Sequence, residues 1–140
     1  MKSIETKIRK VVIARCDSGE DLFEALTTLV KEYYVVSGHF QVMGALSHGK
    51  VGIFENRQYV WMEHSGALEI SSCVGNVAVK EGQPLVHCHA VLNDHNGKLI
   101  AGHVAKGCIV NPTAEIHLTV HDGEVTRKLD EPSGLWKLNL

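Results

Sequence analysis

Residues 85–92 read Leu85-Val86-His87-Cys88-His89-Ala90-Val91-Leu92, and Asn93-Asp94-His95-Asn96-Gly97 follows directly. The first stretch has the length and apolar content of a β-strand. The second predicts a hairpin turn, because Asn and Gly tolerate the positive φ that such turns need. The next strand, from residue 98, leads into Ala101-Gly102-His103-Val104. We therefore expect an antiparallel hairpin that turns near Gly97.

Three histidines of this hairpin are expected to converge. Residues two apart in a strand point to the same face, so His87 and His89 project together. His103 lies about as far past the turn as His89 lies before it, which places it opposite the pair. Three imidazoles meeting at one point suit zinc or another borderline divalent metal, with a fourth position open to a ligand. The alternative is that they are hydrogen-bonded residues of a sheet face or a subunit interface.

Outward from this hairpin, the sequence predicts an α+β fold with a mostly antiparallel sheet. Ser18 and Asp21 have the spacing of a capping box, and the residues after them have the periodicity of one amphipathic helix of about four turns. The strands are expected at residues 8–15, 40–46, 50–54, 58–62, 68–79, 85–92, 98–101, 108–110 and 114–120. A turn at 132–134 precedes residues 135–138, whose apolar side chains are expected to dock onto the domain.

Composition limits the class of protein. The chain has 140 residues, the size of one domain, and no repeat or linker divides it, so residues 1–140 are expected to form a single domain. No apolar run approaches the roughly 18 residues of a membrane span, so we expect a cytoplasmic protein with no membrane contact. The four cysteines form no C-x-x-C pair and are expected to be reduced. With 14 basic and 16 acidic residues, the charge argues against a nucleic-acid binder.

Several short motifs, in order along the chain, resemble the plants and prokaryotes conserved (PPC) domain family. They are Gly19-Glu20-Asp21, Gly38, Met43-Gly44-Ala45-Leu46-Ser47, Val51-Gly52, Leu68-Glu69-Ile70, Gly75-Asn76, the stretch Gly82 to Leu92, Gly97, Ala101-Gly102-His103-Val104 and Thr113-Ala114-Glu115-Ile116. The resemblance implies an antiparallel sheet with flanking helices and assembly into a homotrimer. It also implies that His87, His89 and His103 occupy the positions at which prokaryotic members hold a metal.

The sequence departs from the plant members of this family in two places. It has no Arg-Gly-Arg-Pro segment, so the AT-hook that grips the DNA minor groove is missing. The plant partner-binding motif Gly-Arg-Phe-Glu-Ile-Leu is matched only by Gly66-Ala67-Leu68-Glu69-Ile70-Ser71, without the Arg. The chain thus corresponds to the prokaryotic single-domain type, which is often described as DNA-binding.

Three functions follow from these observations. The first is a homotrimeric PPC-domain protein with a DNA-associated or regulatory role and a three-histidine zinc site. The second is a metal-dependent ligand-binding protein, or a hydrolase-like enzyme in which Glu115 is the general base near the metal. The third is a protein-interaction module. Catalytic residues are assigned only in the enzyme case, because the sequence has no nucleophile elbow, phosphate loop or dinucleotide fingerprint.

Overall fold

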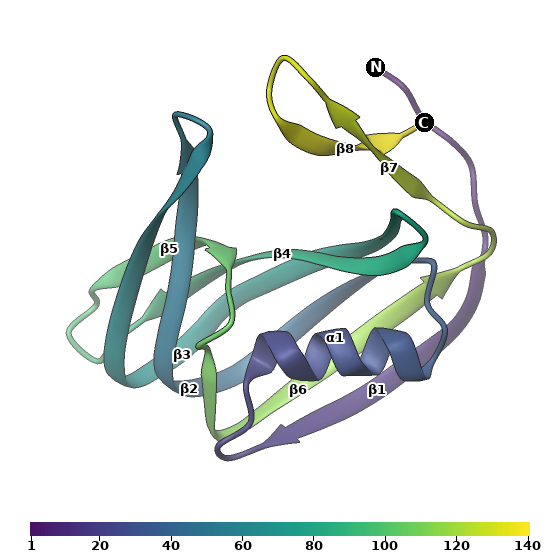
Figure 1. Cartoon of the computed structure of the whole chain (residues 1–140). Helices are drawn as coiled ribbons and strands as arrows, with labels where there is room; N and C mark the ends of the chain where they lie inside the picture. The colour runs from purple at the N-terminus through teal and green to yellow at the C-terminus, as the bar shows by residue number, and fades with distance from the viewer.

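One eight-stranded β-sheet with a single helix packed on it makes up the protein (Figure 1). The computed structural model describes residues 1–140. The strand order is β1-β6-β2-β5-β4-β3-β7-β8, and β2 also pairs with β3. All pairings are antiparallel except that of Val79 with Thr126. The elements are β1 (Ile8–Asp17), α1 (Leu22–Glu32), β2 (Ser37–Glu55), β3 (Gln58–Lys80), β4 (Gln83–Asn93), β5 (Leu99–Val104), β6 (Ile109–His121), β7 (Thr126–Asp130) and β8 (Leu135–Asn139).

The helix begins three residues later than the sequence pattern indicates. Asp21, not Ser18, is the N-cap, and its Oδ1 accepts hydrogen bonds from the backbone N–H groups of Phe23 and Glu24 at 2.9 and 3.1 Å. Ser18 is still part of the turn after β1 and bonds Asn111 instead. Asp21 therefore satisfies two of the N–H groups that the first helical turn leaves without partners. No helix of the protein is long and apolar enough to cross a membrane.

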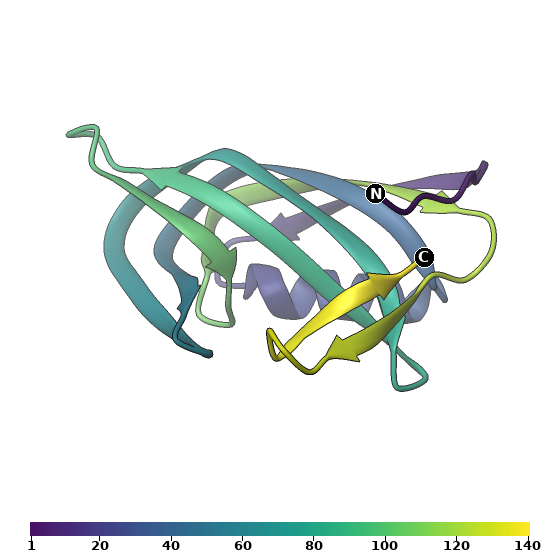
Figure 2. The same ribbon diagram turned by 90° about the horizontal axis from the view of Figure 1, so that it is seen from above.

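The hydrophobic core lies between α1 and one face of the sheet. It holds 26 buried residues, among them Leu22, Leu26 and Val30 of the helix and Phe40 of β2. Strand β6 shows that one face of the sheet is apolar and the other is not. Its buried residues are Ala114, Ile116, Leu118 and Val120, and the residues between them point away from the core. Figure 2 shows α1 on one side of the sheet only. We call the opposite side the open face.

Several predicted strands are halves of longer ones. Residues 40–46 and 50–54 both belong to β2, 58–62 and 68–79 to β3, and 108–110 and 114–120 largely to β6. The glycines and polar residues between the halves produce irregular pairing, for example between Leu46 and His48, rather than turns. Such bulges bend a strand without ending it. The distal parts of β2 and β3, residues 48–65, therefore extend as an arm from the sheet (Figure 1).

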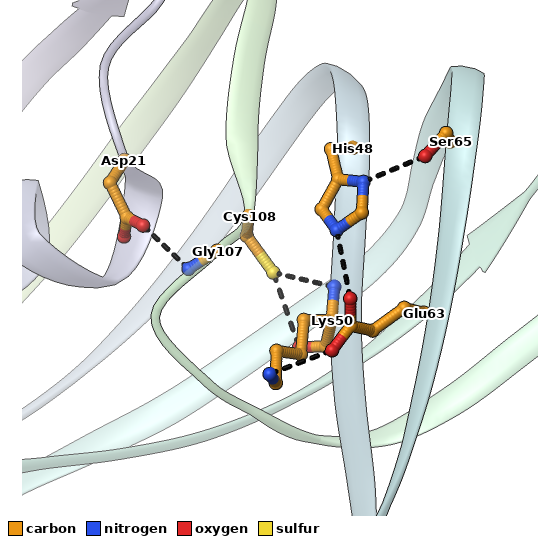
Figure 3. Close-up of polar contacts among 7 residues, drawn as sticks. All are labelled: Asp21, His48, Lys50, Glu63, Ser65, Gly107 and Cys108. Carbon is orange, nitrogen blue, oxygen red and sulfur yellow. Dashed lines mark hydrogen bonds and ion pairs between the residues drawn. The ribbon is translucent and has the colours of Figure 1, made fainter.

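Polar contacts hold the base of this arm against the β5–β6 connection (Figure 3). Lys50 Nζ lies 2.7 Å from the Glu63 carboxylate across the arm. The Cys108 thiol donates to the Lys50 carbonyl oxygen and accepts from the Lys50 N–H, both at 3.3 Å. The N–H of Gly107 donates to Asp21 Oδ2 at 2.6 Å. The helix N-terminus, the arm and the connection that follows β5 are thereby joined.

The chain ends in a second hairpin, β7–β8, which we call the C-terminal hairpin. The expected turn at 132–134 joins the two strands, and the sequence pattern missed the pairing of β7 with β8. Lys80 Nζ lies 4.4 Å from the Trp136 ring centre, a cation–π contact that attaches the hairpin to the sheet. Arg57 Nη2 at the tip of the arm donates to the Pro132 carbonyl oxygen at 3.0 Å. The arm and the C-terminal hairpin therefore touch at their tips.

Candidate metal centre

The three predicted histidines lie together on the open face. His89 of β4 pairs directly with His103 of β5, and His87 is two residues before His89 on the same face. The ring centres are 5.2 Å apart for His87 and His89, 5.1 Å for His87 and His103, and 5.6 Å for His89 and His103. One ring nitrogen from each histidine lies within 4.8 Å of the others. The strand and turn pattern thus brings the three side chains to one point, as expected.

Two glycines make room beside His103. A Cβ on Gly102 would lie 2.4 Å from the Gly52 carbonyl oxygen, so only glycine allows β5 to approach β2 at this point. Gly52 itself pairs with His103, and a Cβ there would lie 2.6 Å from the Trp61 ring. The position of His103 therefore depends on the close packing of β5 against the arm.

The electrostatic surroundings favour neutral imidazoles. Burial lowers the pKa of His103 to about 4, and the charges of His87 and His89 act in the same direction. Burial, followed by the charges of Arg127 and His89, also lowers the pKa of His87. Neutral imidazole is the form that binds metal. Near neutral pH these two histidines need not lose a proton before binding a cation.

The residues present fit a divalent metal. His103 Nδ1 is buried and has no hydrogen-bond partner, although a buried polar atom normally has one. Three imidazole donors with no thiolate match zinc and other borderline cations, and they leave a position for a further ligand. His87, His89 and His103 would hold the ion.

Aromatic rings from the arm cover one side of the group. The Tyr59 ring lies over His103 with its centre 4.9 Å away, and the Trp61 ring stacks on Tyr59 at the same separation. Burial raises the pKa of Tyr59 above its usual 10. On the side of β2, the histidines therefore contact the partly buried aromatic rings of the arm instead of open solvent.

Arg127 of the C-terminal hairpin lies on the other side. Its Nη2 donates to Asn76 Oδ1 at 2.6 Å and lies 3.4 Å from His87 Nδ1. Its Nη1 donates to the Trp136 carbonyl oxygen at 2.8 Å. Asn76 pairs with His87 across β3 and β4, so its side chain emerges on the same face. The histidines therefore lie between Tyr59 of the arm and Arg127 of the C-terminal hairpin.

Glu115, the general base of the enzyme hypothesis, is not part of this group. It lies exposed on β6, where it pairs with Arg15 and Met43. Strands β2 and β3 separate it from the histidines, because the open face carries the row His117, Gln41, Val74 and His89 in neighbouring strands. The hydrolase alternative therefore lacks the base that the sequence suggested for it.

The other six histidines also lie away from the group. His39 and His121 contact each other at 3.0 Å, His48 contacts Ser65, and His64 lies 3.6 Å from Asp94. His95 and His117 are exposed. All six side chains are at least partly exposed, and none belongs to the histidine group.

Sequence reasoning missed Tyr59, Asn76 and Arg127. Asn76 lies in the Gly75-Asn76 motif, but nothing in its type or spacing connects it with a histidine eleven residues later. Tyr59 reaches His103 through the bend of the arm, and Arg127 through the docking of a hairpin. Both contacts are long-range consequences of the fold, so no local pattern predicts them.

Comparison with family models identifies the domain. Residues 3–122 match the model of the Plants and Prokaryotes Conserved domain, abbreviated PCC or PPC. The match includes the helix and all three histidines and ends before the C-terminal hairpin. The comparison with curated proteins finds no relative.

Solved structures share the fold over nearly the whole chain. A protein of Archaeoglobus fulgidus, described as metal-containing, is 28% identical with a TM-score of 0.90, and 100% of each chain is covered. A PPC protein of Pyrococcus horikoshii is 27% identical with a TM-score of 0.86, covering 98% of this chain and 97% of that one. A candidate DNA-binding protein of Bacteroides thetaiotaomicron is 21% identical with a TM-score of 0.88, and 96% of each chain is covered. At 21% identity, the likeness to the last protein concerns the fold alone.

Proposed function

Because the chain belongs to the Plants and Prokaryotes Conserved domain family, we propose that it is a metal-binding protein of the prokaryotic type. His87, His89 and His103 hold a divalent ion, for which zinc is the best match, and a small ligand binds at the position that the histidines leave open. The observation that carries the proposal is the approach of the three ring nitrogens to within 4.8 Å of one another. The similar Archaeoglobus fulgidus protein, described as metal-containing, supports it.

The chain's own residues have separate roles in this proposal. The three histidines bind and orient the ion, and Tyr59 limits access of water to His103. A divalent metal supplies Lewis-acid character to a ligand at the open position. We infer a cytoplasmic location, because four buried, free cysteines suit a reducing compartment.

Metal content is the test of this function. Untagged protein is expected to retain close to one metal ion per subunit after dialysis, measured by plasma mass spectrometry, and the identity of the ion is read from the same spectrum. A His87→Ala, His89→Ala double variant should lose it. The matched control is His64→Ala, His95→Ala, which removes two histidines outside the group and outside the proposed subunit contact. Native protein that holds no metal would refute the proposal, as would equal losses in the two double variants.

We also propose that the protein is a homotrimer assembled through the open face. Four large apolar side chains on this face are strongly exposed: Val11 (58%), Ile13 (71%), Met43 (60%) and Val74 (51%). Large apolar side chains exposed on one sheet face in this number are typical of a protein–protein contact. Light scattering after gel filtration should report three subunits. Ile13→Asp should dissociate them, and Ile53→Asp on the exposed arm should not.

DNA association is a second candidate. It is supported by the exposed basic residues Lys2, Lys7, Arg9 and Lys10 at the N-terminus. The excess of acidic over basic residues opposes it. Duplex DNA that still binds at about 150 mM salt would support this function, whereas binding confined to low salt would be non-specific charge attraction.

A further inference from the structure

Arg127 is a partly buried cation without an acidic partner. None of the ion pairs of the protein includes it. Its three hydrogen-bonding neighbours are neutral: the Trp136 carbonyl, Asn76 Oδ1 and His87 Nδ1. Its Nε is buried and has no partner at all. A charge withdrawn from water in this way is costly unless an opposite charge compensates it.

The histidine group next to Arg127 offers no negative charge to compensate the guanidinium. The charges that act on His87 and His103 come from Arg127 and from neighbouring histidines, and no carboxylate is among them. A divalent ion on the histidines would therefore lie beside a guanidinium, and no ion pair of the protein includes Arg127 or any of the three histidines. In a site of low dielectric constant, two such cations repel strongly.

We propose that the site takes an oxyanion, a carboxylate or phosphate group of a small molecule, between the histidine-bound metal and the Arg127 guanidinium. The inference deepens the proposed function and rests on it, because the metal is one of the two cations that the oxyanion contacts. Arg127 Nη2 lies 3.4 Å from His87 Nδ1, and guanidinium groups bind carboxylate and phosphate through paired N–H donors. Arg127 is thus assigned to ligand binding, not to metal binding.

The proposed ligand site combines two parts of the chain, because the histidines belong to the sheet and Arg127 belongs to the C-terminal hairpin. Nη1 attaches the side chain to Trp136 of its own hairpin, while Nη2 extends to Asn76 and His87 of the sheet. A purely structural arginine would serve only to attach the hairpin. The two roles make different predictions, because attachment affects stability and ligand binding affects affinity for anions.

The test uses full-length protein loaded with Co²⁺, whose visible absorption reports ligands that enter the metal's coordination sphere. Metal content is measured first. Inorganic phosphate and, separately, acetate are then titrated at constant ionic strength, which also tells which oxyanion is preferred. Arg127→Gln should bind one equivalent of metal and weaken anion binding about tenfold or more, since a tenfold change corresponds to the loss of one charge-assisted contact. Arg127→Lys, which keeps the charge but not the paired donors, should give an intermediate affinity.

Lys128→Gln is the matched control. It removes the same charge from an exposed residue of the same strand, and the Lys128 side chain makes no hydrogen bond or ion pair, so unchanged anion affinity is expected. Thermal melts verify that each variant is folded, and Arg127→Lys serves if Arg127→Gln is not. Full metal loading with the same anion affinity in wild type and Arg127 variants would overturn the inference and leave the metal site standing. Wild-type protein that binds no metal would overturn the proposed function itself, before any anion is added.

Discussion

The sheet with its helix and the C-terminal hairpin differ in what stabilises them. Every residue of the 26-residue core lies between Val12 and Val120. The hairpin contributes none, and its Leu129, Leu135 and Leu138 remain 37–41% exposed. The family match likewise ends at residue 122. Burial of apolar surface thus stabilises the sheet, whereas a few polar and aromatic contacts hold the hairpin in place.

This difference separates two properties of the candidate site. The three histidines belong to the sheet, whose geometry is fixed by the core, whereas Arg127 belongs to the hairpin. Metal binding and anion binding are therefore expected to respond to different mutations.

Phe40→Ala should destabilise the protein far more than Trp136→Ala. Phe40 is 1% exposed and packs against Gly75 in the core, so its truncation leaves a cavity and should cost about 3–5 kcal/mol. Trp136 covers the edge of the sheet and contacts Lys80, and its loss should cost about 1 kcal/mol. Urea unfolding measures both values. Equal losses in the free energy of unfolding would mean that the hairpin contributes to stability as much as the core does, which would contradict the difference between the two regions.

The same difference between local and long-range contacts explains how much of the fold and of the candidate site the sequence predicts. The apolar run at residues 85–92, the two-residue period of a strand and the Asn93–Gly97 turn sufficed to predict the antiparallel β4–β5 hairpin and the meeting of His89 with His103. These features are local, since each depends on strand period or turn chemistry. The sequence pattern separates residues 50–54 from 40–46 and residues 58–62 from 68–79, because it does not distinguish a bulge within β2 or β3 from a turn that ends the strand. The contacts of Tyr59 and Arg127 depend on where whole hairpins dock, which only tertiary packing decides.

Gly102→Ala should affect the sheet and the metal together. Its Cβ would collide with the Gly52 backbone, so β5 must move away from β2, at a cost of about 1–3 kcal/mol. His103 is the next residue and should move with it, so metal content should fall. Metal content and urea unfolding are measured on the same preparation.

Gly97→Ala in the turn of the same β4–β5 hairpin is the control. Nothing lies within 4 Å of a Cβ there, although its φ of +76° is strained for alanine. The left-handed backbone should therefore cost about 1–2 kcal/mol, but metal should be retained because nothing beside the histidines has to move. If both variants kept their metal, the close approach of β5 to β2 would not be what positions His103.

Acid should act on the two regions in different pH ranges, which gives the smallest of the expected effects. In metal-free protein the folded-state pKa of His103 is about 4, below its ordinary 6.5. Between these values the unfolded chain binds a proton that the folded protein excludes, so stability falls as the pH falls from 6.5 to about 4. Asp130 of the hairpin has its pKa lowered from 3.8 to about 2, mainly by a hydrogen bond from Lys137 and then by one from Ser133. Its contribution is complete above pH 3.8 and is lost as the pH falls through about 2.

Thermal melts at several pH values with a chelator present distinguish the two groups. His103→Gln should reduce the loss of melting temperature between pH 7 and pH 4.5 and change nothing below pH 4. Asp130→Asn should do the reverse, with a smaller effect because its ion pair with Lys137 lies at the surface. If His103→Gln left the slope above pH 4.5 unchanged, burial of that imidazole would not be the source of acid sensitivity in the sheet. Burial would then not explain why His103 stays neutral and able to bind metal below pH 6.5.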